Sequence, residues 1–200
     1  MKKKRGKKDF SFKEQYKLSW DYLKESRKFI YIIIILFFLL ALIGYFAPTP
    51  KVFEDQILKI IKELLMATKG MNQSQITSFL FLNNVQSSFI GFIFGFVFGL
   101  VPFLVSVFNG YLLGFVAKIT VAAEGWIVLW KIIPHGIFEL PAIWISLGLG
   151  LRLGNFLFEK KKAESFRKYL VEGLRVFIFV VIPLLVLAAL IEGWLISVLS

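Results

Sequence analysis

The sequence holds one histidine, His135, and a glutamate four residues later, Glu139, within the stretch PHGIFELPA. Residues four apart lie on the same face of a helix, close enough for their side chains to hydrogen-bond. An imidazole beside a carboxylate can relay protons, and both groups can titrate near neutral pH when they are removed from water. The same pair can instead act as an internal strut that fixes how helices pack. Apolar segments flank the stretch on both sides, so either role places ionisable groups at a membrane, where they are costly.

The composition indicates an integral membrane protein. The chain has 200 residues, of which 58% are hydrophobic and 23 are phenylalanine, and its mean hydropathy is positive. A soluble domain of this length has too little interior for that much apolar surface. Several apolar runs reach the length of about 20 residues that crosses a bilayer. We therefore expect an all-α fold, a polytopic membrane helix bundle with about five transmembrane segments.

The net charge of +11 is unevenly distributed along the chain. Residues 1–28 carry eleven lysines and arginines and residues 152–175 carry seven, whereas residues 48–78 carry four. Segments rich in lysine and arginine stay on the cytoplasmic side of a membrane. We expect a multi-pass protein of the cell membrane with a cytoplasmic N-terminus and an external C-terminus. Since no aromatic and basic platform of the kind that binds single-stranded nucleic acid lies outside the apolar runs, nucleic acid is not an expected partner.

Breaks in the apolar pattern divide the chain into four parts. Residues 1–28 predict a basic cytoplasmic amphipathic arm on the inner membrane surface, and residues 29–47 predict a first transmembrane span that ends at two prolines. Residues 48–78 predict an external segment that contains an amphipathic helix at 53–69. That helix either lies on the outer surface or packs on the bundle. Residues 79–200 predict the core membrane bundle.

Four further spans are expected in the core bundle. Their expected positions are 79–101, 103–123, 134–158 and 176–200, with a turn at Pro102 and a basic cytoplasmic loop near 159–175. Before the first of them, the polar stretch MNQSQ offers Ser74 or Thr77 as a helix cap.

Two prolines and a glycine make the backbone around His135 ambiguous. Pro141 has no amide hydrogen and disfavours helix at Leu140, and Gly136 loosens the turn further. Residues 134–141 therefore predict either a helix or a broken or re-entrant element. A broken element needs polar side chains such as asparagine to satisfy its backbone groups. Such breaks line ligand or ion sites in some membrane proteins and are structural joints in others.

Glycines recur at four-residue spacing in three of the expected spans. They are Gly91, Gly95 and Gly99 in the second span, Gly110 and Gly114 in the third, and Gly150 and Gly154 in the fourth. Helices in lipid associate by close packing, which a glycine face permits. The spacing predicts a tight bundle of the second, third and fourth spans. Homodimerisation through Gly91, Gly95 and Gly99 is the alternative use of the same face.

The remaining ionisable and nucleophilic residues indicate no catalysis. The chain has no cysteine, so disulfide and thiolate chemistry is excluded, and with one histidine neither a metal site nor a cofactor is expected. Arg152 lies near the inner end of a span and Lys118, Glu124 and Lys131 lie near outer ends, where long side chains extend to the membrane surface. No nucleophile motif surrounds the intramembrane serines, so a hydrolase is not expected.

Four short elements occur together in the core bundle. They are NN at 83–84, FNGxxxG at 108–114, HGxxELPA at 135–142 and IEGW at 191–194. In combination and in this order they make the region from about 79 to 194 resemble the stage II sporulation protein M family. The resemblance implies a small polytopic membrane protein without catalysis of its own. In spore-formers the family member anchors two peptidoglycan-degrading partners at the membrane.

Two functions follow as expectations. The resemblance implies a scaffold that organises membrane or envelope partner proteins, whereas the pair His135 and Glu139 suits a transporter or channel component with a proton- or ion-linked site. Carried over position by position, the resemblance marks these residues: Asn83, Asn84, Asn109, Gly110, Gly114, His135, Gly136, Glu139, Pro141 and Glu192.

Overall fold

The described part of the chain folds as an all-α bundle with five segments that can span a membrane. The computed structural model describes residues 11–199, and it describes side chains over residues 11–127 and 136–191. Every regular element in that part of the chain is helical. Among the described residues, five helical segments are long and apolar enough to cross a membrane, at Phe12–Phe46, Gln73–Phe96, Leu100–Glu124, Gly136–Phe158 and Lys162–Ile191. The predicted fold class is therefore confirmed.

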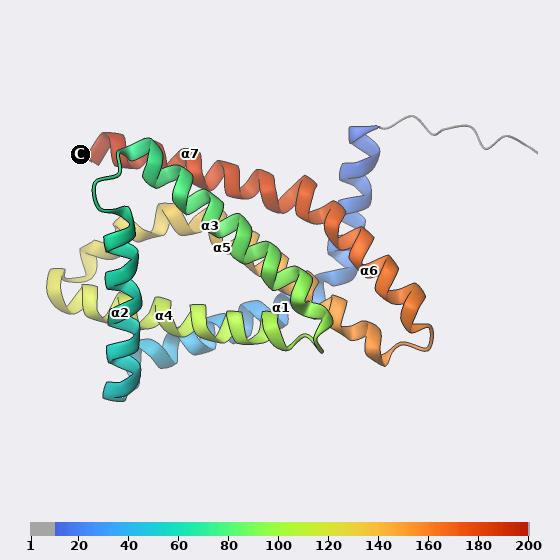
Figure 1. Cartoon of the computed structure of the whole chain (residues 1–200), viewed down its shortest axis with the longest axis horizontal. Coiled ribbons are helices and arrows are strands. Elements are labelled where there is room, and N and C mark those ends of the chain that lie inside the picture. Colours follow the sequence, from blue (N-terminus) through green and yellow to red (C-terminus); the bar gives the residue numbers. More distant parts are fainter. Residues whose placement is uncertain (1–10, 200) are drawn as a thin grey trace, which may run out of the picture.

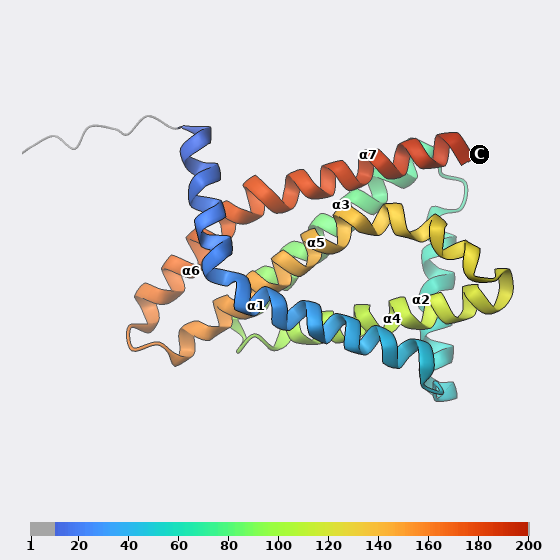
Figure 2. The ribbon, with the colours of Figure 1, turned by 180° about the vertical axis from the view of Figure 1, so that it is seen from behind.

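The first helix joins the predicted arm and the first span. Helix α1 runs without interruption over Phe12–Phe46, a length of 35 residues. Figure 2 shows that its first part runs in a different direction from the rest. Ala47 ends the helix, and the prolines at positions 48 and 50 prevent its continuation. The arm and the span were predicted as separate parts, but they form one element.

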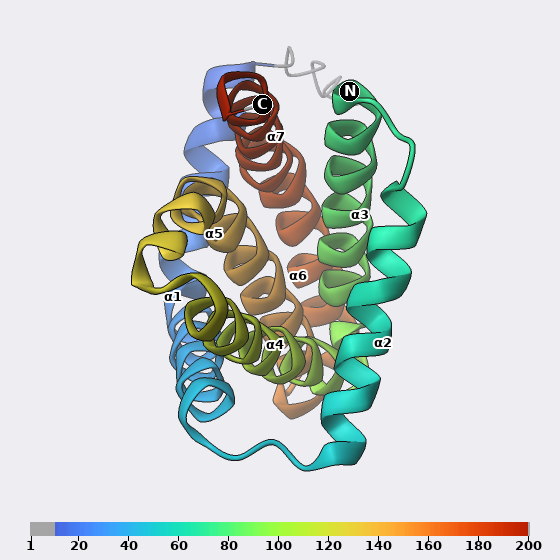
Figure 3. The same ribbon diagram turned by 90° about the vertical axis from the view of Figure 1, so that its left-hand side faces the viewer.

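The amphipathic helix expected at 53–69 is present as helix α2. It covers Lys51–Thr68 and connects the end of α1 to the start of α3. Figures 1 and 3 show that α2 runs crosswise to the long helices along one side of the bundle.

Helix α3 (Gln73–Ile93) begins with a capping box. The side chain of Asn72 accepts a 3.0 Å hydrogen bond from the amide of Gln75, and the Gln75 side chain accepts a 2.9 Å bond from the amide of Asn72. This satisfies two amide groups that the helix leaves free at its start. The cap predicted at Ser74 or Thr77 is wrong, because the helix begins before both residues.

The turn between the second and third spans lies earlier than predicted. A 3₁₀ turn, η1 (Phe94–Phe96), follows α3, and Gly99 adopts a left-handed conformation with φ of 69° before α4 (Leu100–Glu124) begins. Glycine reaches this conformation without the steric cost that a side chain adds. Pro102 was predicted to mark the turn, but it lies inside the first turn of α4, where its missing amide hydrogen is not needed.

Helix α5 passes through the predicted break without interruption. After a short 3₁₀ turn, η2 (Trp126–Val128), the helix covers Leu129–Gly154. Residues 134–141 are therefore helical, and the re-entrant alternative is not what forms. Figure 2 shows that the helix changes direction in its first half, which contains Pro134 and Pro141. A proline inside a helix commonly produces such a bend, and neighbouring helices support the backbone around it.

The last span begins earlier than expected. A 3₁₀ turn, η3 (Asn155–Phe158), leads into α6 (Lys162–Val176), which continues through a π-helical turn, η4 (Phe177–Val181), into α7 (Ile182–Leu199). The predicted loop at 159–175 is thus mostly helix. Its apolar residues pack against the buried core while its lysines face outward, and this amphipathic pattern is what forms α6.

Glycines bring α3 and the turn that follows it into backbone contact with α5. A side chain at Gly95 would strike the backbone of Gly150, and one at Gly150 would strike that of Gly91. Gly154 similarly meets Gly95 and Gly99. The face predicted for either packing or homodimerisation is therefore covered by α5 of the same chain.

The glycines of the third span face a different helix from the one predicted. Gly110 and Gly114 of α4 lie against the backbone of Phe37 and Ala41 in α1. Gly44 of α1 meets the backbone of α4 in return. The close bundle thus includes the first span, and α4 packs chiefly along α1 rather than between α3 and α5.

The ends of the bundle carry different elements. In Figure 1 the start of α1, α6 and the turn before it lie at one end, and α2, the α4–α5 turn and the end of α7 lie at the other. The described part of the first basic segment, residues 12–28, therefore lies at the same end of the molecule as the second, residues 152–175.

Candidate functional site

A cavity of about 710 Å³ lies between α1, α4 and α5. Asn109 from α4 lines it with an amide and Glu139 from α5 with a carboxylate. Its other lining residues are Phe37, Leu112, Leu113, Val116, Ala117, Gly136, Ile137, Leu140, Pro141, Ile143 and Trp144. The fold therefore gathers Asn109, Gly136, Glu139 and Pro141, four of the residues marked by the sequence, around one apolar space.

Asn109 and Glu139 differ in the hydrogen-bonding groups that they bring to the cavity. The side-chain amide of Asn109 donates a 2.9 Å hydrogen bond to the carbonyl of Val105, one turn earlier in its own helix. Such a bond uses one of the two N–H donors of the amide and leaves its oxygen as an acceptor. Asn109 and Glu139 are both half-buried. The edge-to-face contact of Phe37 and Trp144, 5.5 Å between ring centres, closes the wall on the side of α1.

These groups define what the cavity can hold. A carboxylate and an amide oxygen are hydrogen-bond acceptors, so the cavity suits an apolar group that carries an N–H, an O–H or a positive charge. Among the described residues, no cluster of three or more histidine, cysteine, aspartate or glutamate side chains forms a metal site.

Other residues marked by the sequence lie away from the cavity or outside the described side chains. Asn83 is exposed and Asn84 is half-buried on α3, and neither lines the cavity. Gly110 and Gly114 belong to the contact of α4 with α1. The side chains of His135 and Glu192 lie outside the described residues. The predicted pair of His135 and Glu139 thus stays a prediction.

Lys118 has a specific partner near the outer end predicted for its span. Its ammonium group donates a 3.2 Å hydrogen bond to the carbonyl of Ala47 at the end of α1. A cation at a helix C-terminus satisfies a free carbonyl and complements the helix dipole. The side chain therefore joins the ends of α1 and α4.

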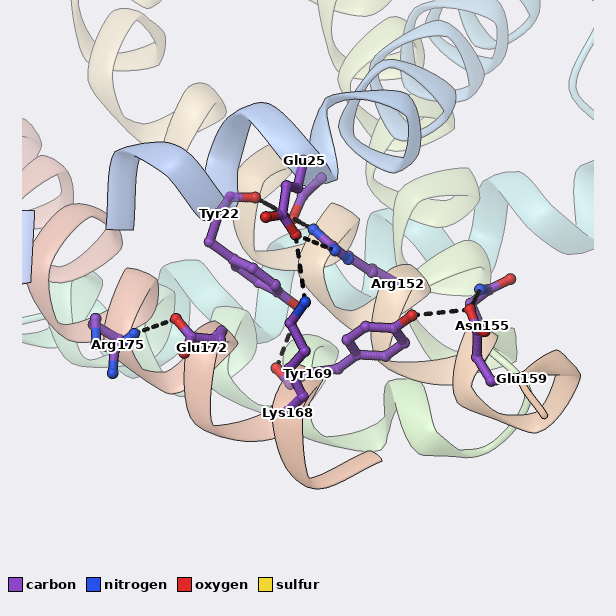
Figure 4. Close-up of polar contacts among 10 residues, drawn as sticks. Tyr22, Glu25, Arg152, Asn155, Glu159, Lys168, Tyr169, Glu172 and Arg175 are labelled. Atoms are coloured by element: carbon purple, nitrogen blue, oxygen red, sulfur yellow. Dashed lines mark hydrogen bonds and ion pairs between the residues drawn. The ribbon is translucent and has the colours of Figure 1, made fainter. Parts of the chain in front are cut away.

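A second polar centre, which the sequence did not reveal, surrounds Arg152. The residue was predicted to extend to the membrane surface, but it is buried, with 7% of its surface exposed. Its guanidinium donates hydrogen bonds to Ser26 Oγ at 2.7 Å and to Glu25 Oε2 at 2.8 Å, and a longer one of 3.3 Å to the Tyr22 carbonyl. Figure 4 shows these contacts between α5 and the first part of α1.

Aromatic rings complete the surroundings of this guanidinium. Its carbon lies 4.1 Å from the ring centre of Tyr22 and 5.1 Å from that of Tyr169 in α6. A cation above an aromatic face is attracted to it, more strongly where water is excluded. The rings and hydrogen bonds thus supply what a buried arginine requires, whereas a lone buried charge is costly.

Further contacts connect the same region to α6. Tyr169 donates a 2.9 Å hydrogen bond to Glu159 Oε1, and Lys168 lies 3.8 Å from Glu25 Oε2. Arg175 pairs with Glu172 and donates a 2.9 Å bond to Gln15 of α1. We call the contacts of Arg152 with Tyr22, Glu25 and Ser26 the arginine junction. Together with the α6 contacts, it fixes the first part of α1 onto the core.

Only one feature of the sequence hinted that Arg152 is buried, namely the glycines around it. Arg152 lies within GLGLRLG, whose glycines imply a closely packed helix, and a long side chain on such a helix has little free space. The identity of its partners was not accessible, because Ser26 lies 126 residues earlier in the chain.

Comparison with known proteins identifies the family. The family model described as Stage II sporulation protein M matches residues 33–196. The chain belongs to this family. It is also 29% identical over 174 residues to an uncharacterized protein of Methanocaldococcus jannaschii, a match that covers 84% of this chain and 77% of the relative. No solved structure matches the chain.

The cavity and the arginine junction lie differently relative to residues 33–196, the region that the family model matches. The cavity, with Asn109 and Glu139, lies wholly inside the stage II sporulation protein M region. The arginine junction crosses its boundary, because Arg152 lies inside the region while Tyr22, Glu25 and Ser26 precede residue 33. The junction therefore attaches the first part of α1 to the family's core bundle.

Proposed function

We propose that this protein is a membrane scaffold that holds membrane or envelope partner proteins in place and catalyses no reaction of its own. The supporting observation is the apolar cavity with acceptor groups from Asn109 and Glu139. Helices in a bilayer gain little from hydrophobicity and recognise each other by close packing and polar contacts. A concave apolar surface with two acceptors offers both to the transmembrane segment of a partner. The anchoring role implied by the family resemblance agrees with this use.

Photo-crosslinking in native membranes tests the proposal. A photoreactive residue at Leu113 would face the cavity, and one at Leu104, exposed on the opposite face of α4, is the matched control. We expect a protein adduct of defined mass at Leu113 and none at Leu104. If both positions give only lipid adducts, no partner occupies the cavity and the scaffold proposal loses its support.

A transporter or channel component is the second candidate, because the carboxylate of Glu139 lines the same cavity. Ionisable groups inside membrane proteins often lie on ion or proton pathways. Vesicles reconstituted with the pure protein would then dissipate an imposed proton gradient, and Glu139→Gln would abolish that flux. The matched control is Glu63→Gln, which changes an exposed carboxylate on α2. Flux lost only in Glu139→Gln would favour the transporter over the scaffold.

The proposed orientation places the start of α1 and the turn before α6 in the cytoplasm and the end of α7 outside the cell. Its support is the clustering of basic residues in these two segments, which lie at one end of the bundle.

A further inference from the structure

Helix α2 leaves most of its apolar side chains uncovered. Of its 18 residues, all of which the structure describes, Ile57 alone is buried. Large apolar residues around it remain exposed: Phe53 59%, Leu58 42%, Ile60 42%, Leu64 45% and Leu65 65%. The bundle therefore accounts for only a small part of this apolar surface.

Three exposed apolar residues of α2 lie on one side of the helix together with the buried Ile57. Phe53, Ile57, Ile60 and Leu64 follow at intervals of three or four residues, which is the spacing of a single helical stripe, and of these only Ile57 is covered by the bundle. Lys59 and Lys62 do not fit this spacing, and Lys62 projects almost opposite Leu64 at 100° per residue. The helix thus has one apolar side and one charged side.

The position of α2 indicates what covers its apolar side. Its axis runs crosswise to the spans, near the end of the bundle that also holds the α4–α5 turn and the end of α7 (Figures 1 and 3). A helix in this orientation lies parallel to the membrane plane when the spans cross the bilayer. At the end of the spans, this plane is the boundary between headgroups and acyl chains. Amphipathic helices bind this boundary with their apolar side toward the acyl chains.

We propose that α2 is a membrane-interface helix whose exposed apolar residues Phe53, Ile60 and Leu64, beside the buried Ile57, are inserted among the acyl chains of one leaflet. The partner of this surface is the lipid bilayer itself. The proposal is independent of the scaffold function, because it concerns neither the cavity nor the arginine junction.

The charges of α2 specify the kind of lipid contact. The helix carries three lysines and three acidic residues, at positions 51, 59 and 62 and at positions 54, 55 and 63, so its formal charges cancel. Attraction to anionic headgroups contributes about 1 kcal/mol per basic residue near a charged membrane, and acidic residues oppose it. Insertion therefore depends on apolar burial and is the same in neutral and anionic bilayers.

Site-specific fluorescence in the full-length protein tests this proposal. The chain has no cysteine, so Leu64→Cys and Lys62→Cys each provide one labelling site for an environment-sensitive fluorophore. In phosphatidylcholine vesicles, we expect the label at position 64 to be quenched by lipids that carry a nitroxide on the acyl chain. The label at position 62 should be quenched by aqueous iodide. Ile60→Cys is a second apolar-side site in case Leu64→Cys impairs folding.

Three results would overturn the proposal. Quenching of positions 60 and 64 by iodide to the same extent as position 62 would place the apolar side in water. Protection of positions 60 and 64 from both quenchers would mean that protein covers it, either the bundle or a second copy of the chain. Acyl-chain quenching that appears only after anionic lipid is added would assign the attachment to charge instead of apolar burial.

Discussion

Arg152 of α5 donates a 2.7 Å hydrogen bond to the hydroxyl of Ser26, which in turn donates a 2.7 Å bond to the carbonyl of Tyr22 in its own helix. Ser26 is fully buried, so its hydroxyl depends on these protein partners. This relationship sets the position of the first part of α1 relative to the last turns of α5. The N-terminal helix is therefore held by a specific contact with the core in addition to any attraction to lipid.

Removing the guanidinium should release the first part of α1. Arg152→Ala deprives Ser26 and Glu25 of their charged donor, and we expect the free energy of unfolding to fall by roughly 1–3 kcal/mol. Limited proteolysis within residues 12–28 should become faster, and thermal unfolding in detergent should occur at lower temperature. Lys168→Ala is the control, since its exposed contact with Glu25 at 3.8 Å contributes about 1 kcal/mol or less. Equal protease resistance in the two variants would contradict a structural role for the junction.

Enlarging Gly95 should separate α3 from α5. Gly95→Leu forces a side chain into the backbone of Gly150, and overpacking of this kind costs roughly 1–3 kcal/mol. Thermal unfolding in detergent measures the loss. The matched control is Gly136→Ala, whose methyl group would meet only the flexible end of the Leu140 side chain. Unchanged stability of Gly95→Leu would show that this contact does not hold the bundle together.

Filling the cavity should block a partner without unfolding the protein. Ala117 lines the cavity, and a phenylalanine at this position fits within a volume of about 710 Å³. We expect Ala117→Phe to keep or raise the thermal stability and to abolish the crosslink formed from Leu113. Ile119→Phe, on the exposed surface of the same helix, should leave that crosslink intact. A persistent crosslink in a stable Ala117→Phe variant would place the partner elsewhere.

Cysteine labelling should reveal opposite sides for the two ends of the bundle. A cysteine at Lys161, exposed in the turn before α6, should react with a membrane-impermeant reagent only from the cytoplasmic side. A cysteine at Lys59, exposed on α2, should react only from outside. Labelling of both positions from the same side would refute the five-span orientation.

The pairing of His135 with Glu139 can be measured by a double-mutant cycle. If the two side chains are struts in contact, His135→Gln and Glu139→Gln each leave a partner unsatisfied and lower stability by roughly 1–3 kcal/mol. The double variant should then lose less than the sum of the single losses, as residues in contact do. Unfolding in detergent gives all three values. Strictly additive losses would show that the residues do not interact.

The sequence by itself determined the class of the protein and the existence of its main helices. Apolar runs of membrane-spanning length establish the spans, because the bilayer imposes a minimum length on any segment that crosses it. The amphipathic helix expected at 53–69 appears as α2 at Lys51–Thr68, since its pattern is local and strongly periodic. The four short motifs likewise indicated the family that residues 33–196 match.

Only the tertiary structure decided which faces meet. The spacing of Gly110 and Gly114 shows that a helix can approach closely, but it does not name the helix, and the partner proved to be α1. Similarly, Pro141 permits either a broken element or a continuous helix, and residues 134–141 proved to be helical. The sequence predicted that the Arg152 side chain extends to the membrane surface. In the folded chain it is instead buried and hydrogen-bonded to Tyr22, Glu25 and Ser26. Local periodicity specifies the surface that a helix presents, whereas the cost of burying a polar group depends on partners that only the folded chain brings into contact.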